Sequence, residues 1–176
     1  MKAKEEIIVR KEMVLMHEEF LSALDKAVEA ENYVEATWLC YSIFEQRITR
    51  LIEKHISFCP RKKKTKGVPA SITTRISCLK KLVSSKYGGY EFFDKNILIE
   101  IEKWCNKRND LVHGLVSIEH YKKYDSEFKD LAINGTPLVK KLYKEASKFR
   151  KWYYAKNQFG VFPNIKCRCT QKCIME

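Results

Sequence analysis

Residues 94–114, DKNILIEIEKWCNKRNDLVHG, decide how this chain folds. Their apolar side chains recur every three or four residues, the spacing that places them on one face of an α-helix. These side chains belong to Ile97, Leu98, Ile101, Trp104 and Cys105. Asp94 is expected to start the helix, and Gly114 to end it. The stretch therefore predicts an amphipathic helix that carries Arg108 to His113 near its end.

The same periodicity recurs along most of the chain, whereas no alternating strand pattern and no internal repeat is found. Further helices are expected over residues 4–31, from Tyr33 to about Ile56, from Ser71 to Leu82, from Ser117 onward, and from Pro137 to about Lys156. Asn32 and Ser71 are expected N-caps, and Asn134-Gly135-Thr136-Pro137 is expected to interrupt the helix that contains it. The fold class is therefore all-α, an up-and-down bundle of about five helices.

The length of 176 residues fits one domain, and 45% hydrophobic residues fit a folded one. We expect a helical domain over residues 1–156 and a basic, cysteine-containing tail over residues 157–176. No apolar run has the length needed to cross a bilayer, and the opening residues show no secretory signal. The expected location is the cytoplasm, with no membrane partner.

The net charge of +12 is concentrated after the first helices. Residues 1–58 carry 8 basic and 11 acidic side chains, whereas residues 59–176 carry 26 basic and 11 acidic ones. Such an excess attracts polyanions, so RNA is the expected partner. The densest cationic run consists of Arg61, Lys62, Lys63, Lys64 and Lys66. These side chains are candidate RNA-backbone contacts, and the alternative is a solvated loop.

The seven cysteines do not form a recognisable framework. Cys40, Cys78 and Cys105 fall in helical patterns, where a reduced thiol is usually a small buried apolar group. The tail holds three more thiols, at Cys167, Cys169 and Cys173. A zinc site there needs a fourth ligand, from Cys59 or a second subunit, and lacks the usual spacing. We therefore predict no metal site and no cofactor, and an unstructured or loosely packed tail.

The candidate chemistry lies in Arg108-Asn109-x-x-x-His113. Asn109 and His113 are one helical turn apart and face the same way, and Arg108 is long enough to reach toward the same cleft. Histidine titrates closest to neutral pH, and arginine clamps phosphate oxygens. The motif therefore indicates phosphodiester chemistry. The alternative is that Arg108 and Asp110 are surface charges and His113 caps the helix C-terminus.

A helical bundle with Arg-Asn-x-x-x-His near the end of its fourth helix resembles the HEPN superfamily (higher eukaryotes and prokaryotes nucleotide-binding). The catalytic members share Arg-x(4–6)-His, often with Asn after the arginine, and Arg108, Asn109 and His113 match these positions. The likeness covers roughly residues 5–156. It implies a homodimer that cleaves RNA without a metal at a composite site, acting as a toxin or in defence against phages and mobile elements.

The resemblance also bears on control of the protein and on auxiliary residues. It implies an antitoxin or a regulatory protein as a further partner. In one branch a tyrosine two residues after the histidine is modified by the antitoxin, but this chain has Leu115 there. The second helix of the family often carries an acidic residue toward the cleft, for which Glu45 is the candidate. His120 is a second auxiliary candidate because it begins the next expected helix.

The mechanism that follows is cleavage by the RNA 2′-hydroxyl. His113 acts as general base or general acid, and Arg108 stabilises the charge on the phosphate oxygens. Asn109 positions the phosphate or orients the imidazole. The alternative function is a non-catalytic HEPN-like module that binds a partner protein, a nucleotide or RNA.

Overall fold

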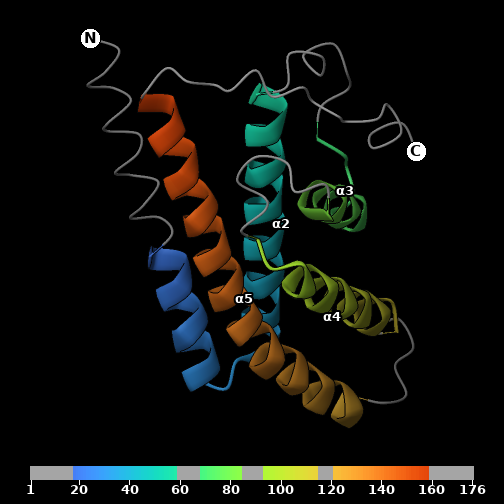
Figure 1. Ribbon diagram of the computed structural model, residues 1–176. Coiled ribbons are helices and arrows are strands. Elements are labelled where there is room, and N and C mark those ends of the chain that lie inside the picture. Colours follow the sequence, from blue (N-terminus) through green and yellow to red (C-terminus); the bar gives the residue numbers. More distant parts are fainter. Residues whose placement is uncertain (1–17, 59–67, 85–92, 115–120, 159–176) are drawn as a thin grey trace.

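The computed structural model describes residues 18–58, 68–84, 93–114 and 121–158. Within these ranges the chain is helical apart from short connections, and it contains no strand (Figure 1). A first helix covers residues 18–29, and it is followed by α2 (Tyr33–Phe58), α3 (Ile72–Ser84), α4 (Lys95–Gly114) and α5 (Tyr121–Gln158). The prediction of an all-α helical bundle is confirmed.

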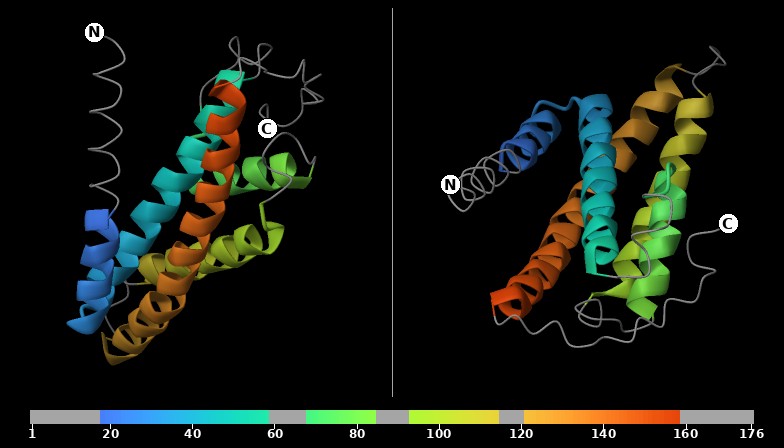
Figure 2. Two further views of the ribbon diagram at one scale, coloured as in Figure 1. Left: turned by 60° about the vertical axis from the view of Figure 1, so that its left-hand side comes forward. Right: turned by 90° about the horizontal axis from the view of Figure 1, so that it is seen from above.

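The central helix of the bundle is α2, which contacts α3, α4 and α5. In Figures 1 and 2, α5 runs along one side of α2, and α3 and α4 pack on the other side. The helix of residues 18–29 is joined to α5 by an ion pair between Asp25 Oδ1 and Lys140 Nζ (2.8 Å). Because α4 packs against both α2 and α5, its buried face lies where three helices meet.

Three of the helix starts predicted from capping residues are confirmed, and the fourth, at Ser117, lies outside the described residues. Asn32 Oδ1 accepts a hydrogen bond from the Glu35 backbone N–H at the start of α2 (3.4 Å), and Ser71 Oγ accepts one from the Thr74 N–H before α3 (3.2 Å). Asp94 Oδ1 accepts the Asn96 N–H at the start of α4 (2.8 Å). These side chains satisfy backbone donors that a helix start leaves unpaired.

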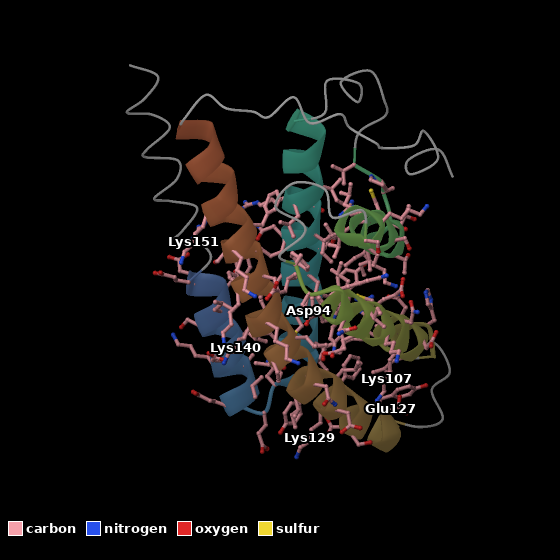
Figure 3. The ribbon with its side chains drawn as sticks, viewed as in Figure 1. Asp94, Lys107, Glu127, Lys129, Lys140 and Lys151 are labelled. Atoms are coloured by element: carbon pink, nitrogen blue, oxygen red, sulfur yellow. The ribbon has the colours of Figure 1, made fainter. Side chains whose placement is uncertain are left out.

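The start of α4 is also tied to α5. The Asp94 backbone N–H donates to Glu145 Oε2 (3.1 Å), and Glu145 is one of the few charged side chains that the bundle buries. Figure 3 shows Asp94 at the centre of the molecule, beside α5. Lys148 Nζ provides the compensating charge, 2.5 Å from the other carboxylate oxygen of Glu145. One end of α4 is thereby fixed before the chain reaches the motif.

The core is one continuous apolar cluster to which every described helix contributes. Its largest fully buried side chains are Phe44, Phe149, Leu24, Ile43, Ile48, Ile52, Ile76, Leu79, Leu98, Ile101 and Leu131. Cys40, Cys78 and Cys105 are buried, as predicted, and none of the three forms a disulfide. The apolar face predicted for α4 is also confirmed, because all five of its named residues are buried.

The predicted interruption at residues 134–137 is wrong, because α5 continues through it as one helix of 38 residues. Proline in a helix interior removes one hydrogen bond and crowds the carbonyl four residues earlier. Consistent with this, α5 bends near its middle (Figure 1). Two side chains bond the preceding turn: Asn134 Nδ2 donates to Asp130 O (2.7 Å), and Thr136 Oγ1 donates to Ala132 O (2.8 Å). The helix therefore bends at Pro137 without ending.

Gly135 has a tertiary role in place of the predicted turn. A Cβ atom built on it would lie 2.8 Å from Trp104 Nε1 and 3.0 Å from Cys40 Sγ. The indole of Trp104 fills this space and donates from Nε1 to Leu131 O (2.8 Å). Gly135 therefore lets α4 approach α5 closely, through a residue one turn before Arg108.

Candidate functional site

The last two turns of α4 hold the three predicted catalytic residues in different surroundings. Arg108 is buried, with 7% of its surface exposed, whereas Asn109 is half-buried and His113 is exposed. Leu111 is buried and anchors this end of the helix in the core. Beyond His113, Tyr124 Oη of α5 donates to the Gly114 carbonyl (2.5 Å), which holds the final turn of α4. The motif therefore lies on a rigid element.

Arg108 points onto α2. Its Cζ atom lies 4.2 Å from the ring centroid of Trp38 and 4.4 Å from that of Tyr41. Its Nη1 group donates to Asn109 Oδ1 (3.2 Å). Its Nε and Nη2 atoms are buried and have no hydrogen-bond acceptor in the described part of the chain. The guanidinium is therefore held by two aromatic rings and one amide, with two donor atoms left over.

This arrangement has opposing energetic consequences. A cation over an aromatic face gains about 0.5–2 kcal/mol per ring, depending on desolvation. A buried donor without an acceptor costs about 1–3 kcal/mol, and more when it is charged. An anion with oxygen atoms in one plane is the ligand that two neighbouring guanidinium donors fit best. The Arg108 guanidinium is thus a cation with two donor atoms that lack an acceptor among the described residues.

Of the three predicted catalytic residues, Arg108 and Asn109 are joined by a hydrogen bond, whereas His113 has no hydrogen bond to either of them among the described residues. Asn109 accepts a hydrogen bond from Arg108, so its amide group orients the guanidinium. Among the described residues, no hydrogen bond joins His113 to Arg108 or Asn109. Arg108 reaches Asn109, to which it donates a hydrogen bond, and its guanidinium lies at the same time against the rings of Trp38 and Tyr41 on α2.

Glu45, the auxiliary candidate, is paired with Arg75 of α3. Its Oε1 atom lies 2.9 Å from Arg75 Nη1, which also donates to Thr49 Oγ1 at 2.9 Å. The remaining donors of Arg75 reach backbone carbonyls: Nε donates to Pro69 O (2.5 Å) and Nη2 to Ala70 O (2.9 Å). The Glu45 carboxylate therefore helps to join α2 to α3 and the segment before it.

Electrostatic effects on two neighbouring side chains show that these charges lie near one another. Burial raises the pKa of Tyr41, and the Glu45 charge raises it further, against opposing effects of Arg108 and Arg75. Burial also raises the pKa of the Cys105 thiol to about 12, although the Arg108 charge acts in the opposite direction. In both cases burial is the largest cause of the shift, because it disfavours the charged form of the side chain.

Several predicted residues lie outside the described residues. These are the basic run Arg61, Lys62, Lys63, Lys64 and Lys66, the auxiliary candidate His120, and the tail cysteines Cys167, Cys169 and Cys173. Across the described ranges, no group of three His, Cys, Asp or Glu side chains is arranged to hold a metal ion. Figure 3 labels three lysines of α5, Lys129, Lys140 and Lys151, of which Lys140 pairs with Asp25.

Sequence reasoning missed the role of two aromatic residues. The sequence analysis does not single out Trp38 or Tyr41, and in the structure Trp38 is 48% exposed. Their spacing of three residues, which places both on one face of a helix, is the only signal that could have indicated a shared partner. Which side chain of α4 they meet depends on how the two helices pack.

Comparison of the chain with known protein families, curated proteins and solved structures finds no match. Within the described ranges, the helices are too short or too polar to span a membrane. The fold and the site together define an all-α bundle with a buried, incompletely paired arginine beside the histidine-bearing end of α4.

Proposed function

We propose that this chain is a metal-independent endoribonuclease of the kind that its HEPN resemblance implies. The observation that carries the proposal is the state of Arg108, five residues before an exposed histidine on one helix: its guanidinium is buried, and two of its donor atoms have no acceptor among the described residues. A phosphodiester supplies the acceptor oxygens that this guanidinium lacks. An exposed imidazole at the end of the same helix is open to a substrate.

The proposed reaction is internal transesterification. The imidazole of His113 accepts the proton of a ribose 2′-hydroxyl, whose oxygen attacks the adjacent phosphorus. The bond from phosphorus to the 5′-oxygen breaks, and a general acid protonates that leaving oxygen. The products are a 2′,3′-cyclic phosphate and a 5′-hydroxyl. DNA lacks the nucleophile and is not cut.

Arg108 stabilises the negative charge that builds on the non-bridging phosphate oxygens, and Asn109 holds the guanidinium in orientation. The reaction needs a general base and a general acid, and a single histidine supplies only one of them. A twofold dimer that brings the α4 ends together supplies the second histidine, so we propose a homodimer. A toxin or defence role, with an antitoxin or regulatory protein as partner, belongs to the same proposal.

The test is cleavage of single-stranded RNA in the presence of EDTA by the full chain. His113→Ala is expected to lower the rate at least about 100-fold, the usual contribution of a general acid or base. Asp110→Ala is the matched control, because Asp110 is exposed on the same turn and has no assigned role. Cleavage that survives in the His113 variant, or that requires added magnesium, contradicts the mechanism.

The second candidate is a module that binds RNA or a partner without cleaving it. It is favoured by the separation of Arg108, which is buried and held by α2, from His113, which has no hydrogen bond to it. RNA binding without cleavage by the parent protein, unchanged in His113→Ala, identifies this function.

A further inference from the structure

Trp38 is an unusual residue on the central helix. Its neighbours Ala36, Thr37 and Cys40 are almost fully buried, and Thr37 Oγ1 donates to Phe128 O of α5 (3.4 Å). The backbone of α2 is therefore fixed on both sides of Trp38. Nevertheless, the indole is 48% exposed, although burying an aromatic ring of this size is strongly favourable. Packing of the bundle alone does not account for a tryptophan at this position.

The covered part of Trp38 lies against the candidate site. Its ring centroid is 4.2 Å from Cζ of Arg108, whose Nε and Nη2 atoms find no acceptor in the part of the chain that the structure describes. A flat apolar surface thus lies directly beside an incompletely paired cation. Moving the half-exposed ring off the guanidinium costs one cation–π contact, about 0.5–2 kcal/mol, while Arg108 keeps its contact with Tyr41.

We propose that Trp38 stacks on a nucleobase of single-stranded RNA whose phosphate is bound by Arg108. This inference rests on the proposed RNA substrate. A nucleotide carries both groups that the pair lacks, an aromatic face for the indole and an anion for the guanidinium. The base covers the face of the Trp38 ring that has moved off Arg108. The phosphate oxygens then accept hydrogen bonds from Nε and Nη2 of Arg108. The subsite binds any base without sequence preference, because every base has an aromatic face.

A protein ligand fits these observations less well. An apolar peptide would cover Trp38 and leave the donors of Arg108 unpaired. An acidic peptide would pair with Arg108 without using the aromatic face. The neighbouring exposed apolar residue on α2, Val34, is 45% exposed one turn before Trp38, but it has no contact with the cation and provides a matched control.

The experiment measures binding of a labelled single-stranded RNA oligonucleotide to the full chain carrying His113→Ala, so that binding is read without cleavage. In this background Trp38→Leu, which keeps an apolar side chain but removes the aromatic ring, is expected to weaken binding about 10- to 100-fold. Trp38→Phe is expected to retain most of the affinity, and Val34→Ala all of it. Circular dichroism and thermal melting establish that each variant is folded.

A second oligonucleotide, in which one nucleotide lacks its base, separates stacking from an indirect effect on Arg108. If Trp38 stacks on a base, an abasic nucleotide at one position weakens binding to the parent, and the same change has no effect on Trp38→Leu. Equal affinity of Trp38→Leu and the parent overturns the inference, as does an abasic penalty that persists in Trp38→Leu. RNA cleavage by the wild-type chain tests the proposed function independently, because it does not depend on either result.

Discussion

Two arginines pack against the same helix, α2, and they differ in how their donors are satisfied. Arg75, at the contact between α2 and α3, has acceptors for Nε, Nη1 and Nη2, provided by Glu45, Thr49 and two backbone carbonyls. Among the described residues, Arg108, at the contact between α2 and α4, has one acceptor, and its Nε and Nη2 atoms have none. Both side chains are largely buried, so the difference lies in the protein acceptors that the described helices place around them.

The comparison distinguishes Arg75, which stabilises the fold, from Arg108, which binds a phosphate under the proposed function. A buried guanidinium whose donors are all paired joins the elements around it, because removing it leaves several acceptors without partners. A buried guanidinium with missing acceptors contributes less to stability, and it gains most when an anion arrives. The α2–α3 contact is therefore interpreted as structural, and the α2–α4 contact as the functional region.

The largest expected effects come from replacing each arginine with methionine, which is apolar and of similar length. Arg108→Met is expected to lower RNA cleavage at least about 100-fold, the usual cost of losing a charge-stabilising donor. Its free energy of unfolding is expected to stay within about 1 kcal/mol of the parent, because lost cation–π contacts are offset by removal of unpaired donors. Cleavage assays and chemical denaturation measure the two quantities.

Arg75→Met is expected to show the opposite pattern. Loss of its four hydrogen bonds should lower the free energy of unfolding by roughly 2–6 kcal/mol, at about 0.5–1.5 kcal/mol for each bond. The cleavage rate per folded molecule should change little. If instead Arg108→Met is the variant that unfolds, or Arg75→Met the one that loses activity, the division between the two regions is wrong.

The next effect concerns alkaline pH and tests whether the surroundings of Arg108 are dry. Burial raises the pKa of Cys105 and of Cys40 from 9.0 to about 12. The unfolded chain therefore loses these protons first, so their stabilising effect is complete below pH 9 and is lost between pH 9 and 12. Each thiol should lower the free energy of unfolding by about 1.4 kcal/mol per pH unit in that interval.

Chemical denaturation at pH 8 and pH 10 measures this fall in the free energy of unfolding. The fall should be smaller in Cys105→Ala, because one of the two thiols is absent. At pH 8 neither thiol should react with a thiol reagent until the protein unfolds. Rapid reaction of Cys105 in the native state would mean that water reaches its neighbourhood and satisfies Arg108, and the contrast with Arg75 would disappear.

A smaller effect is expected from Gly135→Ala, which tests the packing that positions α4. The added methyl group would overlap Trp104 and press on Cys40. Overpacking of this kind costs about 1–3 kcal/mol. Because Trp104 lies one turn before Arg108, cleavage should fall as well. Asn134→Ala, at an exposed neighbouring position, should change stability by less than about 0.5 kcal/mol, and thermal melting distinguishes the two.

The smallest effect is expected from Glu31→Gly, far from both arginines. Glu31 has a positive φ of 56° at the end of the first helix, where Asn32 N–H donates to Ala27 O (2.8 Å) and Glu31 N–H to Val28 O (3.1 Å). Glycine adopts this conformation without steric cost. The variant should gain up to about 1 kcal/mol in unfolding free energy with unchanged cleavage. A loss of activity here would show that the functional region extends beyond α4.

Sequence reasoning located the helices well where the signal was local. The caps at Asn32, Ser71 and Asp94 and the apolar face of α4 follow from residue type and spacing, and the structure confirms them. It failed at Gly135, because an Asn-Gly-Thr-Pro segment favours a turn when read alone. The indole of Trp104, 31 positions earlier in the chain, occupies the space that makes glycine necessary within the helix.

The sequence by itself determined that the chain is a bundle of helices and that Arg108, Asn109 and His113 end one of them, because hydrophobic periodicity and capping act over a few residues. Only the tertiary structure decided what surrounds each side chain. Trp38 and Tyr41 meet Arg108 across some 70 positions, and Glu45 meets Arg75 across 30. Such pairings depend on how helices pack, and one helix face is compatible with many partners.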